Sequence, residues 1–366
     1  MSATPRRVPV WSSRALSAAV VFATAMQMLA CQDPSQGVAP ATRMRSGSLA
    51  KAPTPPAGVT VGAPLFGLDA APDGSLLAAV ASGVVRIHAG TTEVVAELPT
   101  VNAVAAVGRG DAFVVTGGSL DPAQIFPTSR KLFRVSNGSV RLVADLWAYE
   151  QAVNPDQIWN QGPVPVESNP FDVVALNGGR VLVADAAAND ILVVQNNGTV
   201  DWVAVLTPVD LPAIDPQPVP TSIAIGPDGA YYVGELTGFP AIPGLSRVWR
   251  IAAGSRHVVC PSAACTLVAG GFTSIMDLAF GLDGTLYIVE FDEAGWLGVE
   301  INGFMMKDGG TVNACNVATG ECSVFACTLS LPTAITVDKA GALWIAEHES
   351  VLFAGARVRR LQQGAC

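Results

Sequence analysis

Charged residues are scarce in this chain of 366 residues, since Asp, Glu, Lys and Arg make up 14% of it, against about 25% in typical domains. Lys and Arg number only 21, and the formal net charge is −9. A chain this acidic repels phosphate groups, so we expect neither nucleic acid nor an anionic membrane surface as a partner. The expected ligand is instead a small molecule or a protein.

Catalytic motifs are also missing. The three histidines, His88, His257 and His348, lie far apart, which leaves little material for a histidine metal site or a Ser-His-Asp triad. The chain contains no Gly-x-Ser-x-Gly nucleophile elbow, no phosphate-binding Gly-Lys-Ser/Thr loop and no His-Glu-x-x-His zinc motif. The sequence therefore assigns no catalytic residue.

Apolar residues and turn formers are abundant. Half of the chain is hydrophobic, the mean hydropathy is +0.41, and 36 Gly and 26 Pro are spread along its length. This composition excludes a disordered chain and predicts a large core built from many short elements. The length suits a single domain only if that domain is a barrel or an array of repeats.

The N-terminus has the pattern of an export signal. Arg6, Arg7 and Arg14 form a basic region directly before an uncharged, mostly apolar run from residue 15 to residue 30. The run is too short to span a membrane comfortably but has the length of a signal-peptide core. It ends Met28-Leu29-Ala30-Cys31, which resembles the lipobox of bacterial lipoproteins, although the Leu stands two residues before the Cys instead of three.

The alternative is ordinary cleavage after Ala25, in the triplet Ala23-Thr24-Ala25. We expect a lipoprotein-type signal peptide over 1–31, a flexible Pro/Ala/Ser-rich tether over 32–58 and a folded domain over 59–366. The protein would be exported from a bacterial cell and touch a membrane only through a lipid on Cys31. Without lipidation it would be secreted or periplasmic. We expect a monomer.

The cysteines fit an exported protein. Seven are present, and lipidation of Cys31 would leave an even number in an oxidising compartment. Cys260 and Cys265 bracket a turn-like tetrapeptide, and Cys315 and Cys322 flank a hairpin loop. The remaining two, Cys327 and Cys366, then pair by elimination. The resulting set is one of about 15 connectivities that six cysteines allow. The predicted disulfides are Cys260–Cys265, Cys315–Cys322 and Cys327–Cys366; a zinc site lacks Cys-x-x-Cys pairs and nearby His.

One pattern of β-like runs recurs six times along the chain. A Gly-containing turn joins two apolar runs in each repeat, at 72–74, 109–111, 177–179, 227–229, 282–284 and 339–341. A third strand follows at 84–87, 132–135, 191–194, 248–251, 312–315 and 358–361, and fourth strands include 140–146 and 200–206. Repeats of roughly 35–55 residues with four strands are typical of β-propeller blades.

The predicted fold is therefore all-β, a six-bladed β-propeller with four-stranded blades. The sixth repeat runs out of sequence after its third strand. We expect the N-terminal stretch 59–65 to supply the missing outer strand and close the ring. No repeat shows the 3.6-residue period of a helix, which excludes a helical solenoid.

An ordered set of segments resembles the ScyD/ScyE family of propellers, which is related to the NHL-repeat propellers. The most distinctive are Tyr149-Glu150…Asn154-Pro155-Asp156 and Gly234-Glu235-Leu236-Thr237-Gly238-Phe239-Pro240. Further matches are 168–171, 183–189, 220–222, 271–277 and 331–333. The resemblance covers about residues 60–361 and implies an exported propeller, but the family has no settled activity to carry over. This chain departs from it by its cysteines, by an insertion at 261–264 and by extra residues around 291–310.

Nearly all the long connections belong to one end of the predicted propeller. Loops after second and fourth strands share one end, here called the loop face, and the Gly turns occupy the other, the turn face. The long connections are 117–130, 147–168, 207–219, 237–245 and 291–308. Long loops on a rigid scaffold usually bind ligands, though they can also merely cover strand edges.

Aromatic residues fall in these loops and have two interpretations. Exposed, they would stack on planar ligands or sugars; buried, they would anchor the loops. They are Trp147, Tyr149, Trp159, Phe239 and Trp296. We expect His348, the histidine at this face, to be an exposed loop residue and not a catalytic base.

Acids recur at one position of the repeat. Six residues past each turn glycine stand Val80, Thr116, Asp185, Glu235, Glu290 and Glu347. Four carboxylates around a channel mouth repel one another unless they are protonated, hydrogen-bonded or bridged by a cation. Calcium is the possible cofactor, with Asp185, Glu235, Asp277 and Glu290 as ligands and Asn169 and Asp172 nearby. Alternatively, each acid accepts backbone N–H groups within its own blade.

The predicted function is binding of a small-molecule or protein ligand at the loop face, without turnover. The candidate binding residues are Tyr149, Glu150, Asn169, Asp172, Asp185, Thr221, Glu235, Thr237, Asp277, Glu290 and Glu347. The alternative is a calcium-dependent lactonase or esterase of the gluconolactonase/paraoxonase kind, although the chain lacks the motifs of those propellers. A quinone-dependent sugar dehydrogenase is disfavoured by the scarcity of His and basic residues.

Overall fold

The computed structural model describes residues 58–62, 64–108, 110–118, 125–159, 166–212, 214–302, 308–349, 355–364 and 366. The expected signal peptide, its Cys31 and nearly all of the expected tether lie outside the described residues. Within those ranges, none of the helices has the length and apolar character needed to cross a membrane.

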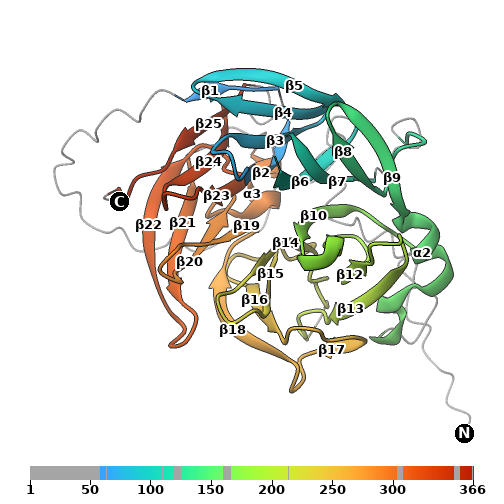
Figure 1. The fold of residues 1–366 in the computed structure, drawn as a ribbon. Coiled ribbons are helices and arrows are strands. Elements are labelled where there is room, and N and C mark those ends of the chain that lie inside the picture. Colours follow the sequence, from blue (N-terminus) through green and yellow to red (C-terminus); the bar gives the residue numbers. More distant parts are fainter. Residues whose placement is uncertain are drawn as a thin grey trace, which may run out of the picture.

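Six β-sheets are arranged in a ring as the blades of a propeller (Figure 1). From the inside outwards, blade 1 contains β2 (Leu65–Ala70), β3 (Leu76–Val80), β4 (Gly83–His88) and β5 (Thr91–Glu97). Blade 2 contains β6 (Val101–Gly108), β7 (Asp111–Thr116), β8 (Lys131–Ser136) and β9 (Ser139–Asp145). Blade 3 contains β10 (Pro170–Ala175), β11 (Val181–Asp185), β12 (Asp190–Val194) and β13 (Val200–Leu206).

In the same order, blade 4 contains β14 (Pro220–Ile225), β15 (Tyr231–Glu235), β16 (Ser246–Ile251) and β18 (Cys265–Phe272). Blade 5 contains β19 (Ile275–Phe280), β20 (Leu286–Glu290), β21 (Gly310–Asn316) and β22 (Glu321–Leu329). Blade 6 contains β23 (Ala334–Val337), β24 (Leu343–His348), β25 (Ala356–Arg360) and β1 (Val59–Thr60). The predicted all-β, six-bladed propeller is confirmed.

The N-terminal strand closes the ring. β1 pairs antiparallel with β25, with Val59 opposite Val358, and so supplies the outer strand of blade 6. This strand is shorter than the predicted stretch 59–65, because Leu65 already begins the inner strand of blade 1. All three predicted disulfides are present, and Cys327–Cys366 ties β22 of blade 5 to the end of the chain.

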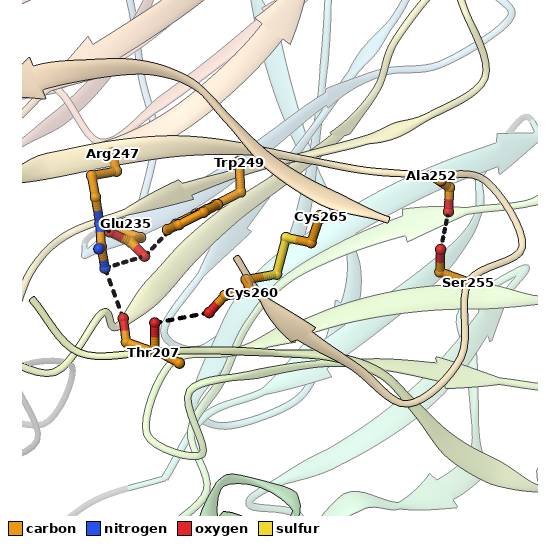
Figure 2. Close-up of a disulfide and its surroundings, with 8 residues drawn as sticks. All are labelled: Thr207, Glu235, Arg247, Trp249, Ala252, Ser255, Cys260 and Cys265. Atoms are coloured by element: carbon orange, nitrogen blue, oxygen red, sulfur yellow. Dashed lines mark hydrogen bonds and ion pairs between the residues drawn. A yellow bond between two sulfur atoms is a disulfide. The ribbon is translucent and has the colours of Figure 1, made fainter. Parts of the chain in front are cut away.

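Blade 3 carries a fifth strand that the sequence did not predict. β17 (Val258–Cys260) lies between β16 and β18 in sequence but pairs in parallel with β13 of the neighbouring blade. The Thr207 hydroxyl donates to the Cys260 carbonyl at 2.8 Å, beside the Cys260–Cys265 disulfide (Figure 2). This connection therefore fastens blade 4 to blade 3.

The turns between the first and second strands explain why the repeat is visible in the sequence. In blade 4, Gly229 adopts a φ of 76°, which costs a glycine little, and the Asp228 carboxylate accepts the N–H of Ala230 at 3.1 Å. The strands on either side of this turn are largely buried, since every residue of β15 and every residue of β14 except Ile225 is buried. The hydrophobic core lies between neighbouring blades.

Candidate functional site

The helical segments outside the turns lie in the connections of the loop face. α2 (Leu146–Val153) and the 3-10 segment η2 (Pro155–Trp159) follow the fourth strand of blade 2, and α3 (Gly295–Ile301) follows the second strand of blade 5. The Asp145 carboxylate caps α2 by accepting the N–H of Ala148 at 3.0 Å. A 3-10 segment at the turn face, η3 (Asn177–Gly179), contains one of the Gly turns.

The four recurring acids lie where the second strands end. Asp185, Glu235 and Glu290 are the last residues of β11, β15 and β20, and Glu347 is next to last in β24. All four side chains are buried. Each carboxyl group has its own set of hydrogen-bond donors, and these donors fall into two kinds.

Asp185 and Glu290 are held by neutral donors. The Asp185 carboxylate accepts the Ser168 hydroxyl and the Asn169 N–H, both at 2.6 Å, and burial raises its pKa despite these bonds. The Glu290 carboxylate accepts the Thr273 N–H at 2.5 Å and the Thr311 hydroxyl at 2.8 Å.

Glu235 and Glu347 are paired with arginines of the third strand. Glu235 binds the Arg247 guanidinium at 2.6 Å and accepts the Trp249 indole N–H at 2.5 Å (Figure 2). Burial outweighs this pairing and raises the pKa of Glu235 to about 7. Glu347 is hydrogen-bonded to Arg359, and both side chains are buried. Both arginine pairs therefore join second and third strands within one blade.

In the part of the chain that the structure describes, no three His, Cys, Asp or Glu side chains are arranged to hold a metal ion. Asp185, Glu235, Asp277 and Glu290 are thus not gathered into one ligand set. A calcium site stays a prediction of the sequence.

Asp172 and Asp277 lie deeper, in the central channel. With Asp69 they line a cavity of about 280 Å³ between the inner strands. Each of the three carboxylates accepts two backbone N–H groups, one of its own strand and one of the next blade; the next-blade donors are Ala106, Ile223 and Ile335. Burial raises the pKa of Asp69 to about 6 and that of Asp172 to about 7. These acids therefore link blades 1, 3 and 5 to blades 2, 4 and 6.

Three apolar side chains lie at the loop-face end of this channel. Phe66, Phe171 and Met276 are the second residues of β2, β10 and β19. The Phe66 and Phe171 ring centroids are 5.7 Å apart, although blades 1 and 3 are not neighbours in the ring. Phe171 and Met276 are buried in one core cluster, against which Phe66 packs. We call these three residues the apolar plug.

Thr221, Thr237 and Asn169 are buried and form structural bonds. The Thr221 hydroxyl donates to the Ile275 carbonyl of the next blade at 2.6 Å, and the Thr237 and Ser246 hydroxyls are 3.2 Å apart. The Asn169 side-chain oxygen accepts the N–H of Gly118 at 2.8 Å. These three candidates hold loops and blades together.

Glu150 belongs to a buried acidic cluster. It lies on α2, is 0% exposed, and has neighbours in Asp156 of η2 and in Asp185 and Asp190 of blade 3. Burial raises the pKa of Glu150 to about 9 and that of Asp156 to about 7. Tyr149 packs beside it against the core of blade 3. Asp190 was not among the predicted site residues, although it directly follows the segment 183–189 of the family resemblance.

The loop aromatics differ from one another in exposure. Trp296 is buried and its indole N–H donates to the Thr237 carbonyl at 3.1 Å, so it anchors α3 to the β15–β16 loop. The Arg130 guanidinium lies 4.4 Å from the centre of the Trp147 ring. Phe239 is 53% exposed, and the Trp159 side chain lies outside the described part. Both interpretations of the aromatics therefore hold, each for different residues.

His348 is buried, so its prediction as an exposed loop residue is wrong. It ends β24, where its Nε2 accepts the N–H of Leu65 at 3.2 Å and its Nδ1 lies 3.2 Å from the Leu331 carbonyl, which accepts from it. Burial lowers the pKa of His348 to about 4. A neutral imidazole at this position joins blade 6 to blade 1, a contact that exists only once the ring closes.

Large apolar side chains are exposed along the loop face. They lie in the connections after second and fourth strands: Ile125, Phe126, Val153, Ile214, Phe239, Ile242 and Ile301. Of these seven residues only Phe239 was predicted from the sequence; Phe126 and the five aliphatic residues were missed. Their presence in the long loops was the available signal.

No protein-family description matches the chain, and no protein of curated function matches it in sequence. Many solved structures share its six-bladed fold. A protein of unknown function from Bacteroides thetaiotaomicron is 13% identical, with a TM-score of 0.54 over 81% of this chain and 69% of its own.

A gluconolactonase from Xanthomonas campestris is also 13% identical, with a TM-score of 0.53 over 83% of this chain and 89% of its own. Regucalcin from Agrobacterium tumefaciens, a calcium-binding protein, has the same identity and TM-score over 82% of this chain and 90% of its own. At these identities the likeness shows the fold alone.

Proposed function

We propose that this chain is an exported, ScyD/ScyE-like propeller that acts as a monomer and binds a small-molecule or protein ligand through its loop face, without turning it over. The observation that carries the proposal is the set of exposed apolar side chains in the loop-face connections. Exposed apolar surface that is contiguous marks interaction sites, because burying it releases free energy.

The surface formed by the β15–β16 loop and α3 is the strongest part of this face. Phe239, Ile242 and Ile301 are 53%, 40% and 74% exposed. The two segments are joined by the hydrogen bond from the Trp296 indole N–H to the Thr237 carbonyl. The backbone N–H of Trp296 also donates to the Ser274 hydroxyl at 3.0 Å. These exposed side chains stand on segments that the core fixes, so a ligand meets a preorganised surface and little ordering entropy opposes binding.

The recurring acids argue against catalysis by the same face. Glu235 and Glu347 are occupied by Arg247 and Arg359, and Asp185 by Ser168 and Asn169. The second candidate is a calcium-dependent lactonase or esterase, for which the sequence predicts calcium ligands among Asp185, Glu235, Asp277 and Glu290, although the described residues do not gather these four into one set. Its support is the fold shared with a gluconolactonase and with regucalcin.

Export is supported by the three disulfides, which persist in oxidising compartments. We propose that Cys31 carries a lipid and holds the propeller at a membrane surface. Cleavage after Ala25 would instead release it.

The test compares three immobilised proteins: the wild type, a Phe239→Ser/Ile301→Ser variant of the loop face, and a Leu282→Ser/Val324→Ser control. Leu282 and Val324, 73% and 50% exposed, lie in a turn-face turn and on the outer strand β22. Each is incubated with envelope proteins and small molecules of the source cell, and bound species are quantified by mass spectrometry. We expect a species that the wild type and the control retain equally and the loop-face variant loses at least about tenfold, a change of about 1.4 kcal/mol. Retention that does not distinguish the variants contradicts the proposal.

A turnover assay separates the two candidates. Wild type and Glu235→Gln are stripped of metal, resupplied with Ca²⁺ and assayed against lactones and aryl esters. Hydrolysis that needs Ca²⁺ and disappears in Glu235→Gln would replace binding by catalysis as the function.

A further inference from the structure

We propose that Glu150 and Asp190 share one proton, and that this proton fastens α2 of the loop face to blade 3, so that the attachment weakens as the pH rises. The proposal concerns the construction of the loop face and does not depend on what that face binds.

The two carboxyl groups come from separate elements and have no other partner. Glu150 lies in the middle of α2, and Asp190 is the first residue of β12. Both are 0% exposed, and no N–H or O–H of the described residues donates to any of their four oxygens. Buried polar atoms are almost always hydrogen-bonded, so four orphaned oxygens in one place need an explanation.

A shared proton supplies the missing bond. The Glu150 and Asp190 carboxyl groups lie within hydrogen-bonding reach of each other. An ionised carboxylate only accepts hydrogen bonds, so the pair is bonded when one member is protonated and repulsive when both are ionised. The proton is then the only polar link between these two side chains.

The surrounding charges reinforce this arrangement. Asp156 of η2 and Asp185 of β11 both act on the pair as negative groups. Asp156 is itself tied to blade 3 through the Asn189 amide at 3.2 Å. The nearby cation, Arg130, acts on Asp185, with Glu167 as its other acidic neighbour. Tyr149, also on α2, is neutral and faces Asp190, Glu150 and Asp201 of β13.

The sign of the pH dependence follows from the protons bound in each state. In the attached state burial raises the pKa of Glu150 from 4.5 to about 9. When α2 detaches, the carboxyl groups are hydrated and ionise at ordinary pH. Attachment is therefore strongest below about pH 4.5, weakens as the pH rises towards about 9, and then levels off. The apolar contacts of Leu146 and Tyr149 with blade 3 do not change over this range.

The first measurement is the infrared carbonyl band of protonated carboxylic acids, recorded at pH 8 for the wild type and Glu150→Gln/Asp190→Asn. The two amides of the variant can bond to each other at any pH. Glu93→Gln, at an exposed position of β5, is the matched control. We expect the band to lose the intensity of one carboxylic acid in the double variant and none in the control. An unchanged band overturns the proposal.

The second measurement is hydrogen exchange in the segment 146–159, expressed as the opening equilibrium after correction for intrinsic rates. Loss of one proton on opening makes this equilibrium rise about tenfold per pH unit between about pH 5 and 8 in the wild type. Asp156, in the same segment, has a pKa of about 7 and adds to the slope only below that pH, so between about pH 7 and 8 the equilibrium should be independent of pH in the double variant. A pH-independent equilibrium in the wild type overturns the proposal.

A cation is the competing occupant. If Ca²⁺ or Mg²⁺ added to metal-free wild type at pH 7 removes the carboxylic-acid band and slows exchange of α2, the pair holds a cation and the shared proton is refuted. If the double variant does not fold, the carboxylic-acid band of the wild type is titrated with pH instead. Disappearance of the band with a midpoint near pH 9 supports the proposal. Absence of the band already at pH 8 refutes it.

Discussion

Removing the ring of Phe171 tests the apolar plug at the loop-face end of the central channel. Phe171 is 4% exposed, and its ring centroid lies 5.7 Å from that of Phe66 across the ring of blades. In Phe171→Ala the neighbouring inner strands are held by hydrogen bonds between blades, so they cannot close the space. The substitution therefore leaves a cavity next to the existing one of about 280 Å³.

The expected cost is about 3–5 kcal/mol, the range for Phe→Ala in a close-packed core, because lost transfer free energy and the unfilled cavity add. The aromatic contact with Phe66 contributes about 0.5–1.5 kcal/mol of that loss. Phe171→Leu keeps most of the volume and should cost less than about 1.5 kcal/mol. Phe126→Ala, at a position 41% exposed on the loop face, should change stability by about 0.5 kcal/mol or less.

Urea unfolding at neutral pH measures these differences, provided that the slope m stays constant between variants. A cost below about 1 kcal/mol for Phe171→Ala would mean that water already reaches this position, and would refute the plug.

Three further predictions concern the ring. Removing the Cys327–Cys366 disulfide, whose cysteines are 39 residues apart, should lower the free energy of unfolding by about 4 kcal/mol. Removing Cys260–Cys265, whose cysteines are 5 residues apart, should lower it by about 2 kcal/mol. Urea unfolding of the two paired Cys→Ser variants measures both losses, and equal losses would contradict the loop-closure argument. In Gly67→Ala the new Cβ would lie 2.6 Å from the Ala103 Cα of the next blade, so we expect a loss of about 1–3 kcal/mol in thermal or urea unfolding, and an unchanged midpoint would show that the blades separate easily. Burial raises the pKa of Asp69 to about 6 and that of Asp172 to about 7, so unfolding releases protons. The free energy of unfolding should therefore fall as the pH rises from about 4 to 7. Urea titrations at pH 4.5 and 7.5 check the direction, and a higher free energy of unfolding at pH 7.5 would refute it.

The blades were predictable because their signals are local. Asp228-Gly229 specifies a tight turn by its own backbone preferences, and apolar runs of strand length flank it. Cys315 and Cys322 were predictable for the same reason, since they face each other across one hairpin. Six such repeats predict the propeller. Because the sixth repeat contains only three strands, a strand from the N-terminal side, β1, was expected to complete its sheet.

The features that were missed depend on contacts between distant segments. β17 joins blade 3 through a parallel pairing with β13, about which its own sequence says nothing. His348 is buried only because Leu65, at the other end of the chain, closes over it. Glu150 meets Asp190 only after α2 folds back onto blade 3. The end of each second strand was predicted well, but the direction of its acid is set by partners elsewhere in the chain. These are Arg247 and Arg359 of third strands for Glu235 and Glu347, and Ser168 and Asn169 before β10 for Asp185.

The most direct test of the proposed function is a hydrogen-exchange footprint of the captured ligand on the wild-type protein. We predict protection in 236–245 and 295–302, the β15–β16 loop and α3, with no change in the turns at 226–230 and 281–285 of the opposite face. Protection confined to the turn face or to the channel strands, with the loop segments unchanged, would contradict it.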